Sequence, residues 1–339
     1  MRRIGGLWPT VTSFENLLAA TRRAAQGKRR QGHIARFLLE REPRLLALRR
    51  SLRADTYRPG PLAHFVIHDP KRRTIGVAPF VDRVVHHAVI DVLEPVFDRR
   101  MIHATFACRR GKGTHAALDY AQRLVRRHRW FLKMDVAQFF ASVPHAAVMR
   151  TVEHIVKDGP LLRLVRRIVD AGGRRDAPGI GLPIGNLTSQ WLANLVLDPL
   201  DREVVERLRI PSYCRYMDDF VVFDDDRERL REARHAIEAT LSSLGLRAKA
   251  RATMLARTAD GLPFLGFMVF ARVRRVRPAN RRRIVARWKR RLWQWRRGQL
   301  DEQGLADGVR SMMAHLEHGT TRAWRRRWCA ALEGRGPMP

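Results

Sequence analysis

The spacing of apolar residues predicts a chain that begins with helices. Residues 14–25 and 33–52 repeat apolar side chains every three or four positions, as a helix with one buried face does. Residues 57–61, with two prolines and a glycine, interrupt this pattern. We therefore expect residues 1–60 to form a basic, helical N-terminal region.

Short strands and longer helices are predicted to alternate after this region. A strand at 64–69, a basic turn at 70–74 and a second strand from 75 would form a hairpin. Helical spacing returns over 81–97 and 116–127, and residues 130–136 form an apolar run of strand length.

The second half of the chain continues the alternation. Residues 189–208 are predicted to form one helix, and 212–223 a hairpin. A helix over 227–245 would end at Gly245, a typical C-terminal cap. Short strands over 263–270 and 272–278 precede a basic helical end that starts at Asn280. This order of elements favours an α/β or α+β fold.

The charge of the chain indicates a polyanionic partner. The 66 Lys and Arg residues outnumber the 33 Asp and Glu residues, which gives a formal net charge of +33. Because the basic residues run along the whole chain, we expect an extended nucleic-acid surface rather than one localisation signal.

Cysteine usage and hydropathy set the expected compartment. The three cysteines lie far apart, so neither a zinc site nor a disulfide framework is indicated. The N-terminus has no signal-like apolar region, and no run of 18 apolar residues occurs. We expect a cytoplasmic protein without a membrane partner.

Two adjacent acids, Asp218 and Asp219, interrupt the apolar hairpin CRYMDDFVVF. One interpretation is a polar turn, because Asp favours turns. The other is a Mg²⁺ site, since buried carboxylates need cations and Mg²⁺ prefers oxygen ligands. Asp135, which ends another apolar run with only Lys133 nearby, would complete a site for two metals.

Several sequence blocks resemble the motifs of reverse transcriptases. CRYMDDFVVF resembles the family's Tyr-x-Asp-Asp hairpin, and FLKMDVAQFF resembles its first catalytic-aspartate motif. GIGLPIGNLTSQWLANLVLDPLD resembles the helix under the incoming nucleotide, and PFLGF resembles the primer grip. KRRTIGVAPFVDRVVHHAV and FACRRGKGTHAALDYA resemble the two fingers motifs. The blocks follow the family order from about residue 65 to about residue 270.

The resemblance implies an RNA-directed DNA polymerase with a right-hand fold and an α+β palm. It implies fingers at 61–128, a palm at 129–272 with 150–180 contributing to the fingers, and a helical thumb at 273–339. Its partners would be template RNA, the RNA/cDNA duplex and deoxynucleoside triphosphates. Two Mg²⁺ ions, with Mn²⁺ as a substitute, would be held by Asp135, Asp218, Asp219 and Val136.

One departure from the common motif points to a particular class of reverse transcriptase. Most reverse transcriptases have Gln-Gly-x-x-x-Ser-Pro where this chain has Ile184 at the first position and Gln190 at the last. This pattern is similar to the reverse transcriptases of diversity-generating retroelements, which copy a template-repeat RNA with errors at adenines and often use a small basic accessory protein. The alternatives are retron-like, intron-derived or phage-defence reverse transcriptases, a non-catalytic RNA-binding protein on the same scaffold, and a general RNA chaperone.

The resemblance also assigns residues around the substrates. Phe140 would be a steric gate against ribonucleotides, although an ordinary core role is open for both rings of Phe139-Phe140. The family's Lys-Thr pair before the primer grip is replaced by Ala252-Thr253, so Lys249 or Arg251 would substitute. The nucleotide-binding candidates are Lys71, Arg73, Gln138, Phe139, Phe140, Ile184, Gly185 and Gln190. The candidates for RNA or primer binding are Arg110, Lys112, Leu265 and Gly266.

Five tryptophans stand among arginines in the expected thumb. They could stack on bases or on guanidinium groups, but for most of them we expect a role in the small thumb core. They are Trp288, Trp293, Trp295, Trp324 and Trp328.

Overall fold

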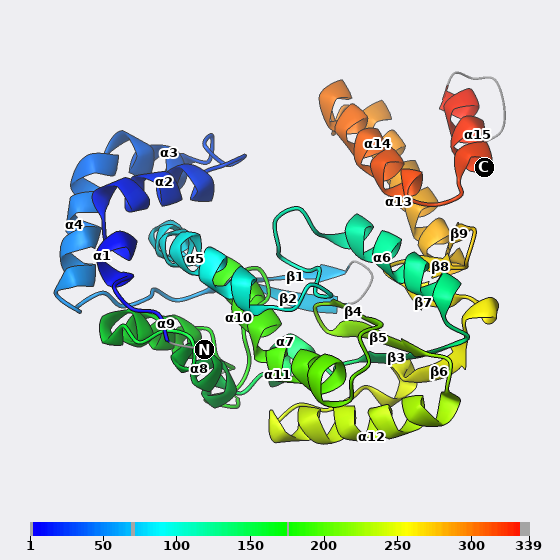
Figure 1. Ribbon diagram of the computed structural model, residues 1–339. Coiled ribbons are helices and arrows are strands. Elements are labelled where there is room, and N and C mark those ends of the chain that lie inside the picture. The colour runs from blue at the N-terminus through cyan, green and yellow to red at the C-terminus, as the bar shows by residue number, and fades with distance from the viewer. Residues whose placement is uncertain (1–2, 69–71, 175, 333–339) are drawn as a thin grey trace.

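The computed structural model describes residues 3–68, 72–174 and 176–332. Figure 1 shows helices at the N-terminal end, a central sheet with helices on both sides, and a separate helical group at the C-terminal end. The N-terminal helices are α1 (Trp8–Val11), α2 (Phe14–Ala24), α3 (Gly32–Leu39) and α4 (Arg41–Arg53). Their buried leucines and alanines join a core shared with α5 (Phe80–Arg100), as their helical spacing predicts.

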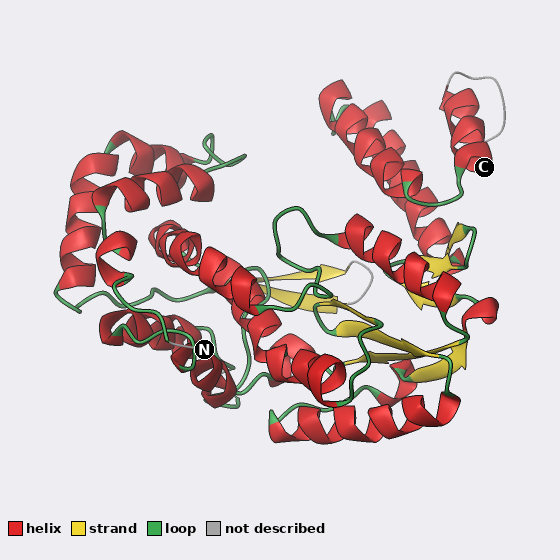
Figure 2. Cartoon of the chain, in the orientation of Figure 1, coloured by secondary structure: helices red, strands yellow, loops and turns green. Residues whose placement is uncertain are grey.

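The central sheet has four antiparallel strands in the order β4-β5-β3-β6. Its strands are β3 (Trp130–Asp135), β4 (Tyr213–Tyr216), β5 (Asp219–Asp224) and β6 (Met254–Arg257). Strand β3 pairs with β5 and with β6, so the strand that ends at Asp135 is central. Figure 2 shows this sheet in yellow in the middle of the molecule.

The two faces of the sheet are covered by different helices. Phe131, Val221 and Phe223 face the core that includes α6 (Thr114–Arg127). Leu132 and Val222 face the core that includes α12 (Arg227–Ser243). This alternation follows from the two-residue period of a strand, and it places Asp135 and Asp219 on the α6 side.

A two-stranded hairpin and several helices complete this part of the fold. The hairpin consists of β1 (Ala63–His68) and β2 (Arg72–Val77). Strand β2 therefore begins inside the basic stretch that we predicted to be a turn. The helices are α7 (Phe139–Ser142), α8 (His145–Glu153) and α9 (Gly159–Ala171).

The single helix predicted over 189–208 is wrong. The segment forms α10 (Leu187–Val196), α11 (Asp198–Arg202) and a π-helical turn, Glu203–Arg207. Pro199 is in the first turn of α11, where its missing N–H is tolerated, whereas inside one continuous helix it would remove a hydrogen bond. The predicted end of α12 at Gly245 is confirmed, because Gly245 has φ of 74° just after the helix.

The C-terminal region has a small sheet and three helices. The sheet has the order β7-β8-β9, with β7 (Leu262–Phe264), β8 (Phe267–Val269) and β9 (Arg274–Val276). The helices are α13 (Pro278–Arg296), α14 (Glu302–Glu317) and α15 (Arg322–Leu332). Within the described ranges, no helix combines the length and apolar character that crossing a membrane requires.

The tryptophans divide as the sequence predicted. Trp288, Trp324 and Trp328 form a buried cluster with neighbouring helices, and the Trp288 and Trp328 rings lie 5.4 Å apart. Trp293 and Trp295 are 48% and 38% exposed. The C-terminal helices therefore have their own aromatic core.

This difference predicts unequal effects of two matched substitutions. Trp288→Ala should destabilise the protein by about 3–5 kcal/mol because a fully buried ring is removed. Trp293→Ala, on the same helix, should change stability by less than about 0.5 kcal/mol. Denaturant unfolding of both variants measures the difference, and equal destabilisation would contradict the assignment of Trp288 to the core.

Candidate active site

Three aspartates meet at one end of the central sheet. Asp135 is the last residue of β3, and its register partner is Asp219, the first residue of β5. Asp218 lies in the turn between β4 and β5, and its backbone carbonyl accepts a hydrogen bond from Val136 N at 3.2 Å. The sheet register thus brings together residues that are more than 80 positions apart in sequence.

Burial raises the pKa values of two of these carboxyl groups, Asp218 and Asp219. Burial, and then the nearby charge of Asp135, raise the pKa of Asp218. Burial raises the pKa of Asp219 to about 6, although the Lys133 ammonium group opposes this shift. Carboxylates with raised pKa values at one edge of a fold are a frequent mark of a functional site.

Two lysines partly neutralise the acidic group. Lys133 Nζ forms an ion pair with Asp219, and Lys249 Nζ lies 3.7 Å from Asp135 Oδ1. Lys249 is one of the two substitutes expected for the family's missing lysine. In the described part of the chain, no three acidic, His or Cys side chains form a preformed metal cluster. The donors nevertheless are all carboxylate oxygens, the ligand type that Mg²⁺ prefers.

A fully buried arginine supports the turn that carries Asp218. Arg215 Nε and Nη2 donate to the two carboxylate oxygens of Asp201 at 2.6 and 2.5 Å. Its Nη1 donates to Asn194 Oδ1 at 2.6 Å and to the Met217 carbonyl at 3.1 Å, and Nη2 also donates to the Asn194 carbonyl. All five guanidinium N–H groups therefore have acceptors.

This network ties the turn to the helices behind it. Met217 has φ of 58°, which is unusual for a residue with a bulky side chain, and Arg215 holds its carbonyl in that conformation. Asp201 also accepts a hydrogen bond from Tyr213 Oη at 2.9 Å, and Asn194 Nδ2 donates to the Ala107 carbonyl at 2.9 Å. The position of Asp218 therefore depends on contacts from α10 and α11.

The segment after Asp135 turns away from the sheet at Gln138. Gln138 has φ of 47° and precedes α7, which begins with Phe139 and Phe140. Phe139 is 3% exposed and belongs to the core, whereas Phe140 is only partly buried, with the two rings 5.7 Å apart. Of the two rings, Phe140 is the one left available to a substrate.

The β1–β2 hairpin approaches the segment that contains Ile184. Gly76 N donates to the Ile184 carbonyl at 3.0 Å. Gly185 has φ of 113°, and a side chain there would lie 2.8 Å from Ile75 Cγ2, so only glycine allows this approach. Arg73 is exposed. Its positive charge partly opposes the rise in the pKa of Asp218 that burial causes, so Arg73 lies close enough to the aspartates to affect them. Lys71 lies outside the described residues.

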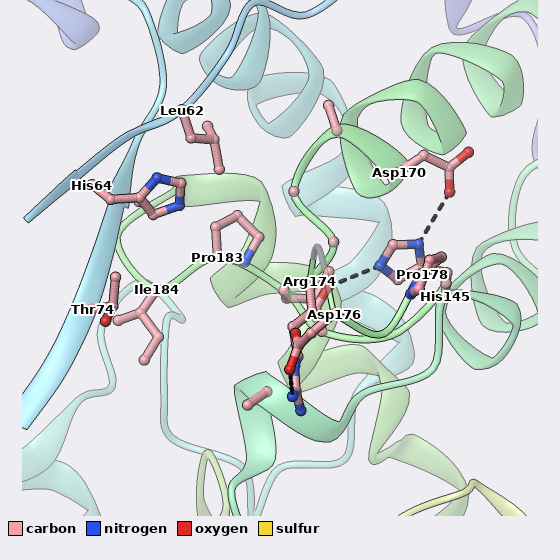
Figure 3. Close-up of a pocket in the computed structure, with 18 of the residues that line it drawn as sticks. Leu62, His64, Thr74, His145, Asp170, Arg174, Asp176, Pro178, Pro183 and Ile184 are labelled. Atoms are coloured by element: carbon pink, nitrogen blue, oxygen red, sulfur yellow. Dashed lines mark hydrogen bonds and ion pairs between the residues drawn. The ribbon is translucent and has the colours of Figure 1, made fainter.

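A cavity of about 990 Å³ lies between this hairpin and residues 172–184. Figure 3 shows His64 and Thr74 on the hairpin side, with Pro183 and Ile184 beside them. Across the cavity, His145 bonds Asp170 at 3.1 Å and the Gly181 carbonyl at 2.8 Å. Ile184 therefore presents an apolar side chain to a cavity next to the β1–β2 hairpin.

The remaining candidates lie in several other places. Gln190 is exposed on α10, with its Oε1 3.9 Å from Cys108 Sγ, and it does not line the Ile184 cavity. Arg110 is exposed and paired with Glu94 at 2.8 Å, and Lys112 Nζ donates to the His103 carbonyl at 2.6 Å.

The neighbouring Arg109 has a different role. Its side chain is largely buried and bonds Asp98, Ile102 and Thr105. Its N–H groups donate to acceptors within this loop, so they are not available to contact a template.

The expected primer-grip residues form the turn between β7 and β8. Leu265 and Gly266 have φ of 44° and 91°. The Gly266 carbonyl accepts hydrogen bonds from Asn280 Nδ2 at 2.9 Å and from Arg277 N at 3.2 Å. The turn is thus fixed against the start of α13.

Sequence reasoning missed Arg215, Asn194 and Asp201. All three lie inside the quoted motif blocks, where an arginine within an apolar strand is an unusual residue. That oddity could have marked Arg215 as a buried, paired charge. Its partners could not have been named, because they come from helices whose packing the pattern does not specify.

The helix-covered sheet and its aspartate cluster define a nucleotide polymerase of the right-hand type. A model of the family described as reverse transcriptase (RNA-dependent DNA polymerase) matches residues 68–269, more than half of the chain. The chain therefore belongs to the reverse transcriptase family, and the expected enzyme class is confirmed.

Individual relatives are distant. Protein YkfC of Escherichia coli (strain K12) is 24% identical over 266 residues, which cover 66% of this chain and 70% of YkfC. Group II intron-encoded protein LtrA of Lactococcus lactis subsp. cremoris is 26% identical over 172 residues, which cover 49% of this chain but only 29% of LtrA.

A solved structure supports the fold. The apo telomerase from Candida tropicalis has a TM-score of 0.50 at 9% identity, and the match covers 65% of this chain and 49% of that one. The likeness concerns the fold alone. Together with the family match, it confirms the expected right-hand architecture with its mixed α and β palm.

The raised pKa of Asp218 predicts a stability effect without metal. Because its pKa in the folded protein exceeds the unfolded value, its favourable contribution exists at low pH and is lost as pH rises through the folded pKa. Asp218→Asn should therefore raise the melting temperature near neutral pH in a chelator, and the gain should disappear in acid. Thermal unfolding across pH measures this, with exposed Asp260→Asn as the control. A lower melting temperature at neutral pH would refute it.

The Arg215 network predicts a second effect. Arg215→Lys should cost about 3–5 kcal/mol, because a lysine cannot make the fork to Asp201 and leaves that buried charge poorly paired. At a temperature where the variant is folded, single-turnover primer extension should slow while primer–template affinity stays close to wild type. Unchanged extension by the folded variant would show that Arg215 acts on stability alone.

Proposed function

We propose that this chain copies RNA into DNA and that its copying is error-prone at template adenines, as in a diversity-generating retroelement. The observation that carries the proposal is Ile184, an apolar residue beside a cavity next to the fingers hairpin. Its substrates would be a template RNA, the RNA/cDNA duplex and deoxynucleoside triphosphates. A small basic accessory protein would assist.

The catalytic group in this proposal is Asp135, Asp218 and Asp219. These carboxylates, with the Val136 backbone, would hold two Mg²⁺ ions or Mn²⁺ in their place, and the metals would supply charge stabilisation for phosphoryl transfer. Lys133 and Lys249 compensate the carboxylates in the protein by itself. With metals bound, both lysines would be free of that role. Lys249, one of the two expected substitutes for the family's lysine, would then be available as a donor to the leaving pyrophosphate.

The nucleotide in this proposal lies between the hairpin and α7. Arg73 and Lys71 would bind the triphosphate, with Arg73 as a planar fork and Lys71 as a point charge. Phe140 would exclude a 2′-hydroxyl group, and Gln138 and Phe139 would shape the segment below it. Gly185 would permit the close approach of the hairpin, and Gln190 would act through α10.

The nucleic acid in this proposal spans the three expected domains. Arg110 and Lys112 would contact the template backbone, and the Leu265–Gly266 turn would support the primer end. We keep the division into an N-terminal region at 1–60, fingers at 61–128, palm at 129–272 and thumb at 273–339. The fixing of the turn to α13 supports a primer contact at the base of the thumb.

The link from Ile184 to fidelity is a hydrogen-bonding argument. A glutamine at this position offers an amide donor and acceptor near the templating pair, whereas isoleucine offers neither. A site that hydrogen-bonds its substrate rejects wrong partners more strongly than an apolar site does. Absence of the amide would weaken that discrimination.

A second candidate function has its own support. LtrA, to which this chain is similar, is named as a group II intron-encoded protein. An intron-derived reverse transcriptase would use the same aspartates and the same fold. The two candidates differ in their expected errors, because only the first predicts errors concentrated at template adenines.

Sequencing of cDNA from primer extension on a structured RNA tests the proposal. Wild type should misincorporate more often opposite adenine than opposite other bases. Ile184→Gln should lower the adenine error rate several-fold, while leaving the rate of extension opposite other bases nearly unchanged. An unaltered adenine error rate in Ile184→Gln would remove the fidelity role of this residue.

Asp218→Ala provides the catalytic control. It should abolish extension and keep RNA binding largely intact, because only the chemistry depends on the carboxylate. Retained polymerisation in this variant would overturn the catalytic assignment. A wild-type enzyme with a flat error spectrum would favour the intron-derived alternative.

A further inference from the structure

A basic groove lies at the end of the central sheet opposite the aspartates. It has a volume of about 650 Å³ and is lined by residues 125–130, 257–259, 270–273 and 275. Trp130, at the start of β3, lines this groove, whereas Asp135 ends the same strand. At roughly 3.3 Å per residue the two ends lie about 17 Å apart. We call this the distal groove.

The charged side chains that line the distal groove are all basic. No Asp or Glu lines it, and in the part of the chain that the structure describes none of its arginines forms an ion pair with a carboxylate. The neighbouring acid Asp225 faces His128 Nδ1 at 3.4 Å and accepts the backbone N–H of Arg129 at 2.8 Å. The six lining arginines, all exposed, are Arg126, Arg127, Arg129, Arg257, Arg272 and Arg275.

Aromatic rings hold several guanidinium groups in place. Among the lining arginines, the Arg257 group lies 5.3 Å from the Trp130 ring and the Arg275 group 5.4 Å from the Phe270 ring. Arg227, which does not line the groove, lies 5.1 Å from the same Trp130 ring. A guanidinium group stacked on a ring keeps its N–H edges free for a phosphate. Stacking also restricts the arginine side chains before binding, so binding an anion costs less conformational entropy. The groove is thus preorganised for an anion.

Long-range hydrogen bonds fix the groove framework. Arg126 Nε donates to the Ala271 carbonyl at 2.6 Å, and Thr258 Oγ1 donates to the His128 carbonyl at 2.6 Å. These bonds connect the end of α6 with the β8–β9 connection and with the end of β6. The spacing of the arginines is therefore set by folded structure rather than by a flexible tail.

We propose that the distal groove binds the sugar–phosphate backbone of an RNA segment that lies outside the polymerase site. Repeated phosphates match a row of arginines better than a single anion does, because each neutralised phosphate releases a counterion. The chain belongs to a family that copies RNA, so long RNA is the polyanion it meets. Nothing in phosphoryl transfer requires this groove. Its effect would be to retain the template between catalytic cycles.

The test compares two double variants with the same change in net charge. Arg257→Gln with Arg272→Gln removes two groove cations. Arg231→Gln with Arg234→Gln removes two exposed cations of α12, each paired with a glutamate and therefore less available to phosphate. Binding is measured for a long single-stranded RNA and for a short primer–template duplex, as a function of salt concentration.

The groove variant should bind the long RNA several-fold more weakly at low salt. The slope of log affinity against log salt should fall by about 1.4, because each phosphate of a single strand that an arginine neutralises adds about 0.7 to it. Its binding and extension of the short duplex should stay at the wild-type level, and the control variant should match wild type throughout. Wild-type affinity and slope in the groove variant would overturn the proposal.

Two further outcomes also count against it. Equal weakening for the short duplex would place these arginines in the polymerase site rather than at a separate one. Weaker binding to anionic phospholipid vesicles, with long-RNA binding unchanged, would assign the groove to a membrane surface. The binding measurements do not need an active enzyme, so failure of the proposed polymerase activity is distinguishable from failure of this proposal.

Discussion

The burial of two neighbouring carboxylates, Asp218 and Asp219, beside Asp135 is the constraint on which the rest of the structure depends. Asp135 and Asp219 are paired across two strands, and Asp218 is in the adjoining turn. Raised pKa values of Asp218 and Asp219 show that the fold holds these groups where their charged forms are disfavoured. Carboxylates in such an unfavourable environment stay in place only when the surrounding structure holds them there. Continuous strand pairing along β3 and the compensating lysines supply that support.

The Arg215 network belongs to the same constraint. A buried ion pair is weak evidence for stability in general, but it is a precise positioning device when every donor has an acceptor. Here one guanidinium group connects Asp201 in α11 and Asn194 in α10 with the carbonyl of Met217. The turn that carries Asp218 is therefore held by α10 and α11, and α10 also carries Gln190, a residue of the proposed nucleotide site. The proposed chemistry and the proposed nucleotide contacts thus share one support.

Sequence patterns predicted the local elements better than their connections. The apolar run at 130–136 and the hairpin pattern at 212–223 identified β3 and β5, and Gly245 marked the end of α12. The helix over 189–208 failed because helical spacing continues across Pro199 while the backbone does not. The grouping of Asp135, Asp218 and Asp219 could be predicted because each lies in a short, local sequence motif. The partners of Arg215, the cavity beside Ile184 and the distal groove could not, since each depends on segments that only tertiary packing brings together.

The placement of β3 in the sheet has a consequence for how the chain acquires its fold during synthesis. This strand lies between β5 and β6, whose paired residues are made roughly 90 and 120 positions later. At roughly 5–20 residues per second, β3 waits on the order of 6–25 s for its last neighbour. The N-terminal helices share their core with α5, which precedes β3 in the chain, so they are free to pack earlier. The apolar strand that ends at Asp135 has two unpaired edges until β5 is made and one until β6 is made, which exposes the nascent chain to aggregation.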